Sequence, residues 1–328
     1  MLSPSPLQRA FLNRFQGGFP LSEHPYQDAA QDLGTNEATL LATIQDMLDV
    51  GLLTRFGPPW DAERLGGRFT LAAMAVPAAD FEGVARMLEA ALEVAHNYRR
   101  DHPLNMWFVL ATPTQSGLDA AIRRIQSTTG VVVYDFPKLR EYHLGFWLHL
   151  GDDGSVGVRR VERARPSEAP TLDTLDLALV AATQAGLPLE PEPFAVLATR
   201  VDTEPATVVA RLQRLLEQGA VRRIGAVPNH YRLGLRGNGM TVWNIEDTEV
   251  DALGERVGAL EGVSHCYRRP RRLPLWPYNL FAMVHGRDRT EVLEGAARIE
   301  AVVAGHSRGH RVLFSEAILK KTGLRFAA

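Results

Sequence analysis

An internal duplication constrains the fold of this chain more than any other feature. The stretch Val263–Gly286 (VSHCYRRPRRLPLWPYNLFAMVHG) has a weaker copy upstream at Val94–Leu110 (VAHNYRRDHPLNMWFVL), and an Arg-Leu-Gly at 64–66 recurs at 232–234. The offset is 169 positions at the shared His-x-Tyr-Arg-Arg core and grows by five at the asparagine, where the second copy has a longer loop. The matched residues are His96 with His265, Tyr98 with Tyr267, Arg99 and Arg100 with Arg268 and Arg269, and Asn105 with Asn279. The chain is therefore predicted to consist of two similar halves.

Each half has the pattern of a winged helix-turn-helix followed by an α+β domain. Apolar residues at helical spacing, separated by turn and capping residues, predict three short helices and a wing strand. Strand and helix patterns then follow as β-α-β-β-α-β, the order of a ferredoxin-like domain. The expected domains are helix-turn-helix modules at 1–60 and 171–228, ferredoxin-like domains at 61–152 and 229–328, and a charged, proline-bearing linker at 153–170.

This order resembles the Lrp/AsnC regulators, and the resemblance covers each half nearly end to end. It implies an α+β fold with two tandem copies of a winged helix-turn-helix plus a ferredoxin-like ligand-binding domain. The two halves are then expected to form an internal pseudo-dimer, their sheets packing on each other as two subunits do. Whether two such chains form a homodimer is left open.

Composition indicates the class of protein, its expected location and the sites that it can form. With 45% hydrophobic and 23% charged residues, the 328-residue chain has the make-up of a soluble globular protein. It contains no apolar run of membrane-spanning length and no recognisable export signal, so a cytoplasmic location is expected. Cys266 is the only cysteine, which excludes an intrachain disulfide and a thiolate metal cluster. No third ligand accompanies any pair of histidines close in sequence, so no metal site is predicted.

The basic residues are almost all arginines. Of the 36 lysines and arginines, only Lys138, Lys320 and Lys321 are lysines. Arginine binds carboxylates through two parallel hydrogen bonds and stacks on flat rings, so this usage suits an anionic, planar ligand. Genomic composition or thermal adaptation is the alternative explanation.

The helix-turn-helix modules lack the charge expected of DNA-reading domains. Phosphate neutralisation by Lys and Arg supplies most of the affinity of such domains. Between Arg14 and Arg55 there is no basic residue of either type, and the net charge of the chain is −2. The modules are therefore interpreted as retained scaffolds without specific DNA binding.

The duplicated motif is the candidate site. Alternate residues of a strand share a face, so His265 and Tyr267 point one way, and His96 and Tyr98 repeat this arrangement. Polar side chains fit poorly beneath the covering helices and better at the interface between the two domains. The alternative is that each histidine is only a hydrogen-bonded interface residue. His230 and His285 are further candidates near the same region, with function and structure equally open.

Five motifs carry a more specific resemblance. GAVPNHYRLGLRGNGMTVW, the stretch Val263–Arg287 and the terminal LKKTGLRF resemble the larger subunit of siroheme decarboxylases, whereas VAHNYRRDHPLNMWFVLAT and LREYHLGF resemble the smaller one. The chain thus looks like a natural fusion of the two. The resemblance implies conversion of siroheme to 12,18-didecarboxysiroheme by loss of two acetate carboxyl groups, in the biosynthesis of haem d1 or haem.

The implied chemistry agrees with the residues at hand. Siroheme is a flat tetrapyrrole fringed with carboxylates, and a histidine suits protonation of the carbon that loses carbon dioxide. Expected catalytic residues are His265, His96 and His230. Expected substrate-binding residues are Arg268, Arg269, Tyr267, Trp276, Tyr278, His285, Arg99, Arg100 and Tyr98. No cofactor beyond the iron-containing tetrapyrrole substrate is expected. The alternatives are a ligand-sensing Lrp/AsnC-like regulator and a tetrapyrrole-binding protein without turnover.

Overall fold

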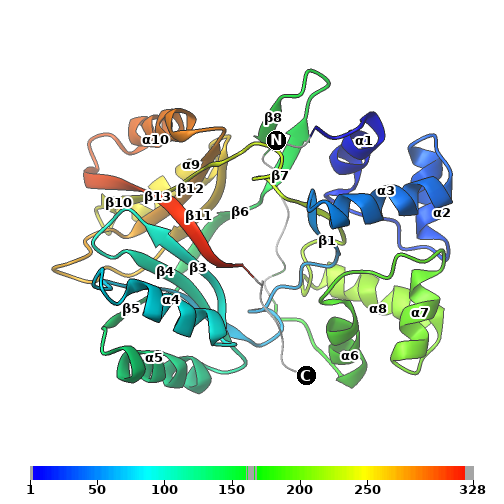
Figure 1. The fold of residues 1–328 in the computed structure, drawn as a ribbon, viewed down its shortest axis with the longest axis horizontal. Helices are drawn as coiled ribbons and strands as arrows, with labels where there is room; N and C mark the ends of the chain where they lie inside the picture. The colour runs from blue at the N-terminus through cyan, green and yellow to red at the C-terminus, as the bar shows by residue number, and fades with distance from the viewer. Residues whose placement is uncertain (1–2, 160, 162–165, 167, 322–328) are drawn as a thin grey trace.

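A computed structural model describes residues 3–159, 161, 166 and 168–321 of the chain. The residues form a helical lobe and a sheet lobe, with the β7–β8 hairpin (Trp147–Leu150 and Val156–Arg159) between them (Figure 1). Both halves of the sequence contribute to both lobes. The duplication therefore does not produce two separate bodies.

The helical lobe contains the two helix-turn-helix modules. Its elements are α1 Pro6–Phe15, α2 Pro25–Asp32, α3 Glu37–Asp49 and β1 Leu53–Gly57, then α6 Thr174–Thr183, α7 Pro193–Arg200, α8 Pro205–Glu217 and β9 Gly225–Pro228. Ser5 and Asp173 begin the first helix of each module with a capping box. The two wing strands pair with each other, and one apolar core contains residues of both modules, among them Phe11, Phe56, Phe194 and Leu212.

The sheet lobe contains two βαββαβ units. The first comprises β2 Arg68–Met74, α4 Phe81–Ala90, β3 Val94–Arg100, β4 Met106–Thr112, α5 Gln115–Thr129 and β5 Val133–Phe136. The second comprises β10 Gly237–Ile245, α9 Val250–Gly258, β11 Val263–Arg268, β12 Leu280–Gly286, α10 Arg289–Val303 and β13 Ser307–Lys321. Helices α4 and α5 lie on one outer side and α9 and α10 on the other (Figure 1). The predicted fold class is confirmed.

The units are joined by exchanged strands. Among the described residues, nine strands form one sheet in the order β5-β2-β4-β3-β13-β10-β12-β11-β6, where β6 is Arg140–Leu144. The long β13 pairs with β10 of its own unit and then with β3 of the other, while β6, which follows β5, pairs with β11. The first half therefore contributes β6 to the second unit, and the second half contributes the end of β13 to the first unit. The expected internal pseudo-dimer is present, and its two units exchange strands in addition to packing on each other.

The inner face of the sheet has a core of its own. Outer residues pack under the helices, whereas Trp107 and Phe136 of the first half meet Met240, Val242 and Phe281 of the second. Matched asparagines support both units alike. The Asn105 amide bonds both backbone groups of Val76 at 2.9 and 2.8 Å, and the Asn279 amide does the same to Ile245 at 2.9 and 3.0 Å.

The predicted linker at 153–170 is partly a strand. Val156–Arg159 pairs with Trp147–Leu150, and residues 160, 162–165 and 167 lie outside the described residues. The hairpin is held to α1 because Asn13 and Gln16 bond the backbone of Leu150 and Leu148 as a neighbouring strand would. Most of the terminal motif LKKTGLRF, from residue 322 on, also lies outside the described residues.

Candidate active site

The duplicated motif lies on two equivalent inner strands, β3 and β11. On β11, Cys266 packs in the outer core, and His265 and Tyr267 point to the opposite face with ring centroids 6.0 Å apart. His96 and Tyr98 on β3 are 6.3 Å apart in the same way. The predicted alternation is confirmed. Burial raises the pKa of the Cys266 thiol, so this cysteine is not a thiolate nucleophile.

One arginine of each Arg-Arg pair faces inward. Arg100 and Arg269 are buried, with guanidinium carbons 5.5 and 5.1 Å from the ring centroids of Tyr98 and Tyr267. Each also donates to a backbone carbonyl of the last strand of a unit, Arg100 to Leu313 at 2.8 Å and Arg269 to Phe136. Burial lowers the pKa of both guanidinium groups to about 10, which leaves them charged at neutral pH.

The other arginine of each pair faces outward. Arg99 pairs with Glu316 at 3.1 Å, and Arg268 pairs with Asp251 at 3.3 Å. These positions follow from alternation along the strand, which places consecutive residues on opposite faces of the sheet. Arg99 and Arg268 therefore do not join the other predicted binding residues.

Trp276 and Tyr278 belong to the inner core between the two units. Trp276 has no exposed surface and packs in the inner core, with its ring 5.0 Å from those of Trp107 and Tyr278. A tryptophan buried in this way fills the space between the two units and presents no surface to a ligand. Its predicted role in substrate binding is not supported by this position.

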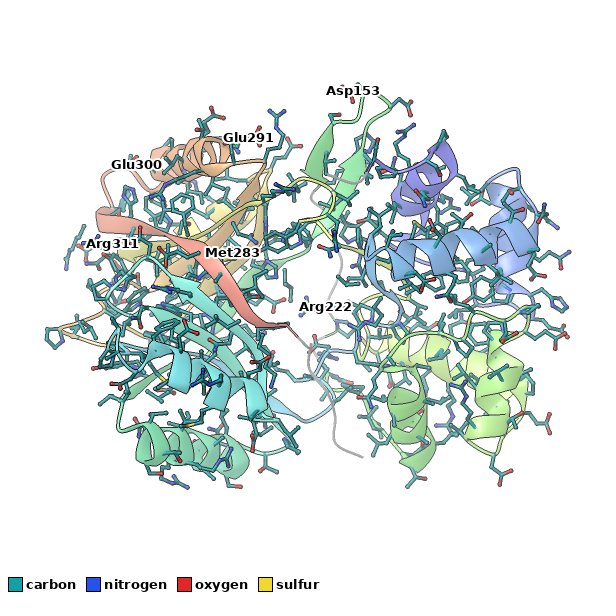
Figure 2. The ribbon with its side chains drawn as sticks, in the orientation of Figure 1. Asp153, Arg222, Met283, Glu291, Glu300 and Arg311 are labelled. Carbon is teal, nitrogen blue, oxygen red and sulfur yellow. The ribbon has the colours of Figure 1, made fainter. Side chains whose placement is uncertain are left out.

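His265 is surrounded by charged groups from the first half and the second wing. The pKa of His265 is lowered to about 4, chiefly by burial and also by nearby His143, Arg222 and Arg269, whereas Glu141 acts in the opposite direction. Arg222 lies between the two lobes (Figure 2), where it pairs with Asp61 at 3.0 Å and with Glu141 at 3.3 Å.

Lys138 completes this charged group. Its amine pairs with Glu63 at 2.5 Å and with Glu141 at 2.8 Å, and it lies 5.8 Å from the Tyr267 ring centroid. The sequence analysis missed Lys138, Glu141, His143 and Arg222 as site residues. The pairing of β6 with β11 brings three of them here, and the only earlier signal was the conspicuous motif LREYHLGF.

Three of the four predicted histidines gather in one cluster. The ring centroid of His285 is 5.3 Å from that of His230, and Phe146 contacts both at 4.4 and 5.0 Å. The Ser264 hydroxyl lies 2.7 Å from His265 Nδ1 and 2.7 Å from His285 Nε2. His96 occupies the matching position of the other unit, on β3.

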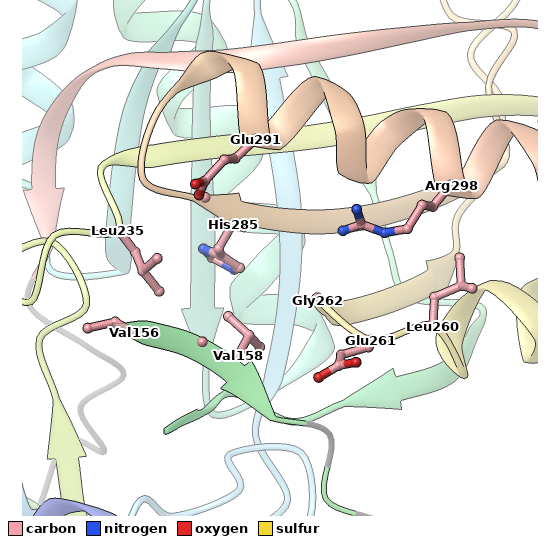
Figure 3. A pocket seen from close by; sticks show the side chains of 11 residues that line it. Val156, Val158, Leu235, Leu260, Glu261, Gly262, His285, Glu291 and Arg298 are labelled. Carbon is pink, nitrogen blue, oxygen red and sulfur yellow. The ribbon is translucent and has the colours of Figure 1, made fainter. Parts of the chain in front are cut away.

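A pocket of about 580 Å³ adjoins this cluster. Figure 3 shows His285 in its wall, with Arg298 and Glu291 from α10 on one side and Val156 and Val158 of β8 on the other. Part of the predicted linker, Val156–Val158, therefore lines this pocket. In the described part of the chain, no three His, Cys, Asp or Glu residues are arranged to hold a metal ion.

Family models match both parts of each half. Residues 8–53 and 176–222 match the siroheme decarboxylase NirDL-like helix-turn-helix domain, and residues 64–143 and 232–320 match the AsnC-like ligand-binding domain. No helix in the described residues has the length and apolar character needed to cross a membrane.

Individual relatives agree with these matches. The siroheme decarboxylase NirDL subunit of Paracoccus denitrificans (strain Pd 1222) is 32% identical over 98% of this chain and 97% of its own. The siroheme decarboxylase NirH subunit of Pseudomonas aeruginosa is 52% identical over 45% of this chain and 87% of its own, as expected if this chain fuses two such subunits.

A solved structure has the same architecture. The crystal structure of the siroheme decarboxylase NirDL in complex with an iron-uroporphyrin III analogue has a TM-score of 0.73 and 29% identity, covering 96% of this chain and 93% of that one. The duplication, the paired domains and the full-length similarity together show that the chain belongs to the siroheme decarboxylase family.

Proposed function

We propose that this protein is a carboxy-lyase that removes two acetate carboxyl groups from siroheme, giving 12,18-didecarboxysiroheme for haem d1 or haem biosynthesis. The observation that carries the proposal is the cluster of His265, His285 and His230 beside the inward Arg269, in a chain similar to siroheme decarboxylases over its whole length. The reaction needs carboxylate binding, a proton donor and exclusion of water. The cluster offers the first two, and its burial supports the third.

The reaction is balanced by one proton for each acetate. The bond between the carboxylate carbon and the methylene carbon breaks, carbon dioxide leaves, and the electron pair stays on the methylene carbon next to the pyrrole. The conjugated macrocycle delocalises this charge, and a proton completes a methyl group. Two acetates therefore consume two protons and release two molecules of carbon dioxide, without any redox change. The proposal uses no cofactor besides the substrate's own iron tetrapyrrole.

His265 is the proposed proton donor. Its pKa of about 4 in the ligand-free protein keeps the ring neutral at neutral pH. A bound polycarboxylate places negative charge beside the ring, and an opposite charge favours the protonated form. Substrate binding therefore charges the histidine at the time when its proton is needed. His230 and His96 are assigned supporting roles, His230 next to His285 and His96 on the matching strand.

Specific DNA binding is not part of the proposal. The arginines of α8 are engaged, Arg211 with Asp173 and Arg214 with Asp176, both at 2.5 Å. Helix α3 has no Lys or Arg, and both wings are used in pairing with each other. These contacts support a scaffold role for the helical lobe.

Anaerobic incubation of the purified protein with siroheme, followed by mass spectrometry of the tetrapyrrole, tests the proposal. Loss of two carboxyl groups, dependent on protein and on turnover time, is the expected result. Siroheme that is bound and recovered unchanged would instead identify a tetrapyrrole-binding protein without turnover.

A further inference from the structure

Ser264 connects two histidines of the site. Its hydroxyl is fully buried and lies 2.7 Å from both His265 Nδ1 and His285 Nε2. A β-bulge allows this arrangement. The pairing of β11 with β12 shifts between Val263 and His265, so that Ser264 is not held in regular alternation.

The three side chains have the chemistry of a proton relay. A hydroxyl donates one hydrogen bond while accepting another, and a neutral imidazole has one donor and one acceptor nitrogen. Ser264 can therefore accept a proton from His285 Nε2 as it passes its own to His265 Nδ1. His265 then releases a proton from Nε2 while His285 takes one up at Nδ1, so that one proton enters the chain for each one that leaves, and the starting tautomers must be restored before the next transfer.

The far end of this chain borders a pocket, although His285 Nδ1 itself is a buried atom. His285 lines the pocket of about 580 Å³, together with the charged side chains of Glu261, Glu291 and Arg298 (Figure 3). His285 is also packed against Phe146 and His230, while His265 faces His143, Glu141, Arg222 and Arg269. His265 and the pocket are thus connected through Ser264.

The matching positions of the first half cannot form this connection. The pairs Val94 with Leu110 and Val263 with Val284 occupy the same place in the two units. Ala95 therefore stands where Ser264 does, and Ala111 stands where His285 does. His96, like His265, is followed along its strand by a tyrosine and an inward arginine, but it lacks counterparts of Ser264 and His285.

We infer that Ser264 and His285 form a relay that carries protons from the pocket to His265 while substrate covers the histidine. This inference rests on the proposed function. Each siroheme consumes two protons, and a histidine that has donated one must be recharged before the second acetate reacts. Ser264 is thus a positioning residue that acts through His265.

The test compares Ser264→Ala with Ser264→Thr, which keeps the hydroxyl, in single-turnover decarboxylation at several pH values. We expect Ser264→Ala to slow the second decarboxylation by on the order of 10²-fold, the low end of what a positioned proton donor contributes, and singly decarboxylated product to accumulate. Ser264→Thr restores the second step. Equal rates for both steps in Ser264→Ala and wild type would overturn the relay.

A second measurement needs no substrate. Nitrogen-15 NMR of the histidine rings should show hydrogen-bonded His265 Nδ1 and His285 Nε2 in the wild type, and loss of both signatures in Ser264→Ala. Unchanged ring signals would contradict the connection itself. If Ser264→Ala does not fold, Ser264→Gly and His285→Phe interrupt the same chain and must give the same accumulation. A wild type that leaves siroheme intact would refute the proposed function, whereas an active wild type with an equally active Ser264→Ala refutes the relay alone.

Discussion

The two halves of this protein carry the same framework around different chemistry. His, Tyr, an inward Arg and a supporting Asn recur at matched positions, and both arginines bond a last-strand carbonyl. The side chains around the two histidines differ. His265 has Ser264, His143 and Glu141 close by, whereas the positions flanking His96 that match Ser264 and His285 are alanines.

This difference teaches where symmetry is retained and where it is lost. The shared residues hold strands together, so changing one would disturb a domain in either half. Under the proposed function, the differing residues determine how a histidine is protonated and recharged. We therefore expect the second half to carry the chemistry and the first half to complete its walls, through β6 and its Glu141 and His143.

The largest contrast is expected between the histidines. His265→Ala should lower turnover by about 10²–10⁴-fold because it removes the proton donor. His96→Ala and His230→Ala should have smaller effects. Single-turnover decarboxylation, measured beside thermal unfolding for all three, separates lost chemistry from lost stability. Full activity in both His265→Ala and His96→Ala would move the chemistry to His230 or His285.

The inward and outward arginines form the next contrast. Arg269→Ala should weaken siroheme binding by about 1.5–3 kcal/mol, the value of a hydrogen bond to a charged group. Arg268→Ala removes a partly exposed ion pair on the other face and should change stability by no more than about 1 kcal/mol, with binding unaffected. Titration of each variant with siroheme gives both affinities. Equal loss in the two variants would show that strand face does not determine binding.

A pH dependence of stability should arise at His265. The folded-state pKa of His265, about 4, lies below the ordinary value of 6.5, so the unfolded chain binds the extra proton first. The stability contributed by neutral His265 is therefore complete above about pH 6.5 and is lost as pH falls towards 4. Unfolding in denaturant across this range should show a shallower decline for His265→Ala than for wild type. Parallel curves would contradict the lowered pKa.

The smallest effect is expected from DNA. Helix α3 has no lysine or arginine, and Arg211 and Arg214 of α8 are held in ion pairs. Only weak binding without sequence specificity is therefore expected at physiological salt. Fluorescence anisotropy with promoter fragments and shuffled controls measures this. Tight binding to one defined sequence would show that a module has kept its ancestral role.

Much of the fold could be predicted because it depends on local pattern. Helical spacing, capping residues and the repeated motif specify each domain, and alternation correctly assigned His265 and Tyr267 to one face. Strand exchange could not be predicted in the same way. It depends on which distant edge β6 and β13 meet, and no short pattern encodes that choice.

The site was predictable only in part for the same reason. His265 and His285 belong to the repeated motif and His230 lies just before the repeated Arg-Leu-Gly at 232–234, but Glu141 and Arg222 come from other elements. Trp276 shows where residue type alone leaves the position of a side chain open. An aromatic residue beside arginines suggests a ligand surface, yet its large apolar ring was more strongly favoured in the core between the units.

The exchanged strands have a consequence for the fusion itself. Because β3 pairs with β13 and β6 with β11, a cut between residues 160 and 168 would leave the halves joined along two strand edges and a common core. The covalent link between the halves then acts chiefly by raising the effective concentration of each half at the other, so that their association is intramolecular. Such a chain delivers both partners in equal number at each round of synthesis, and its assembly does not weaken when the protein is dilute.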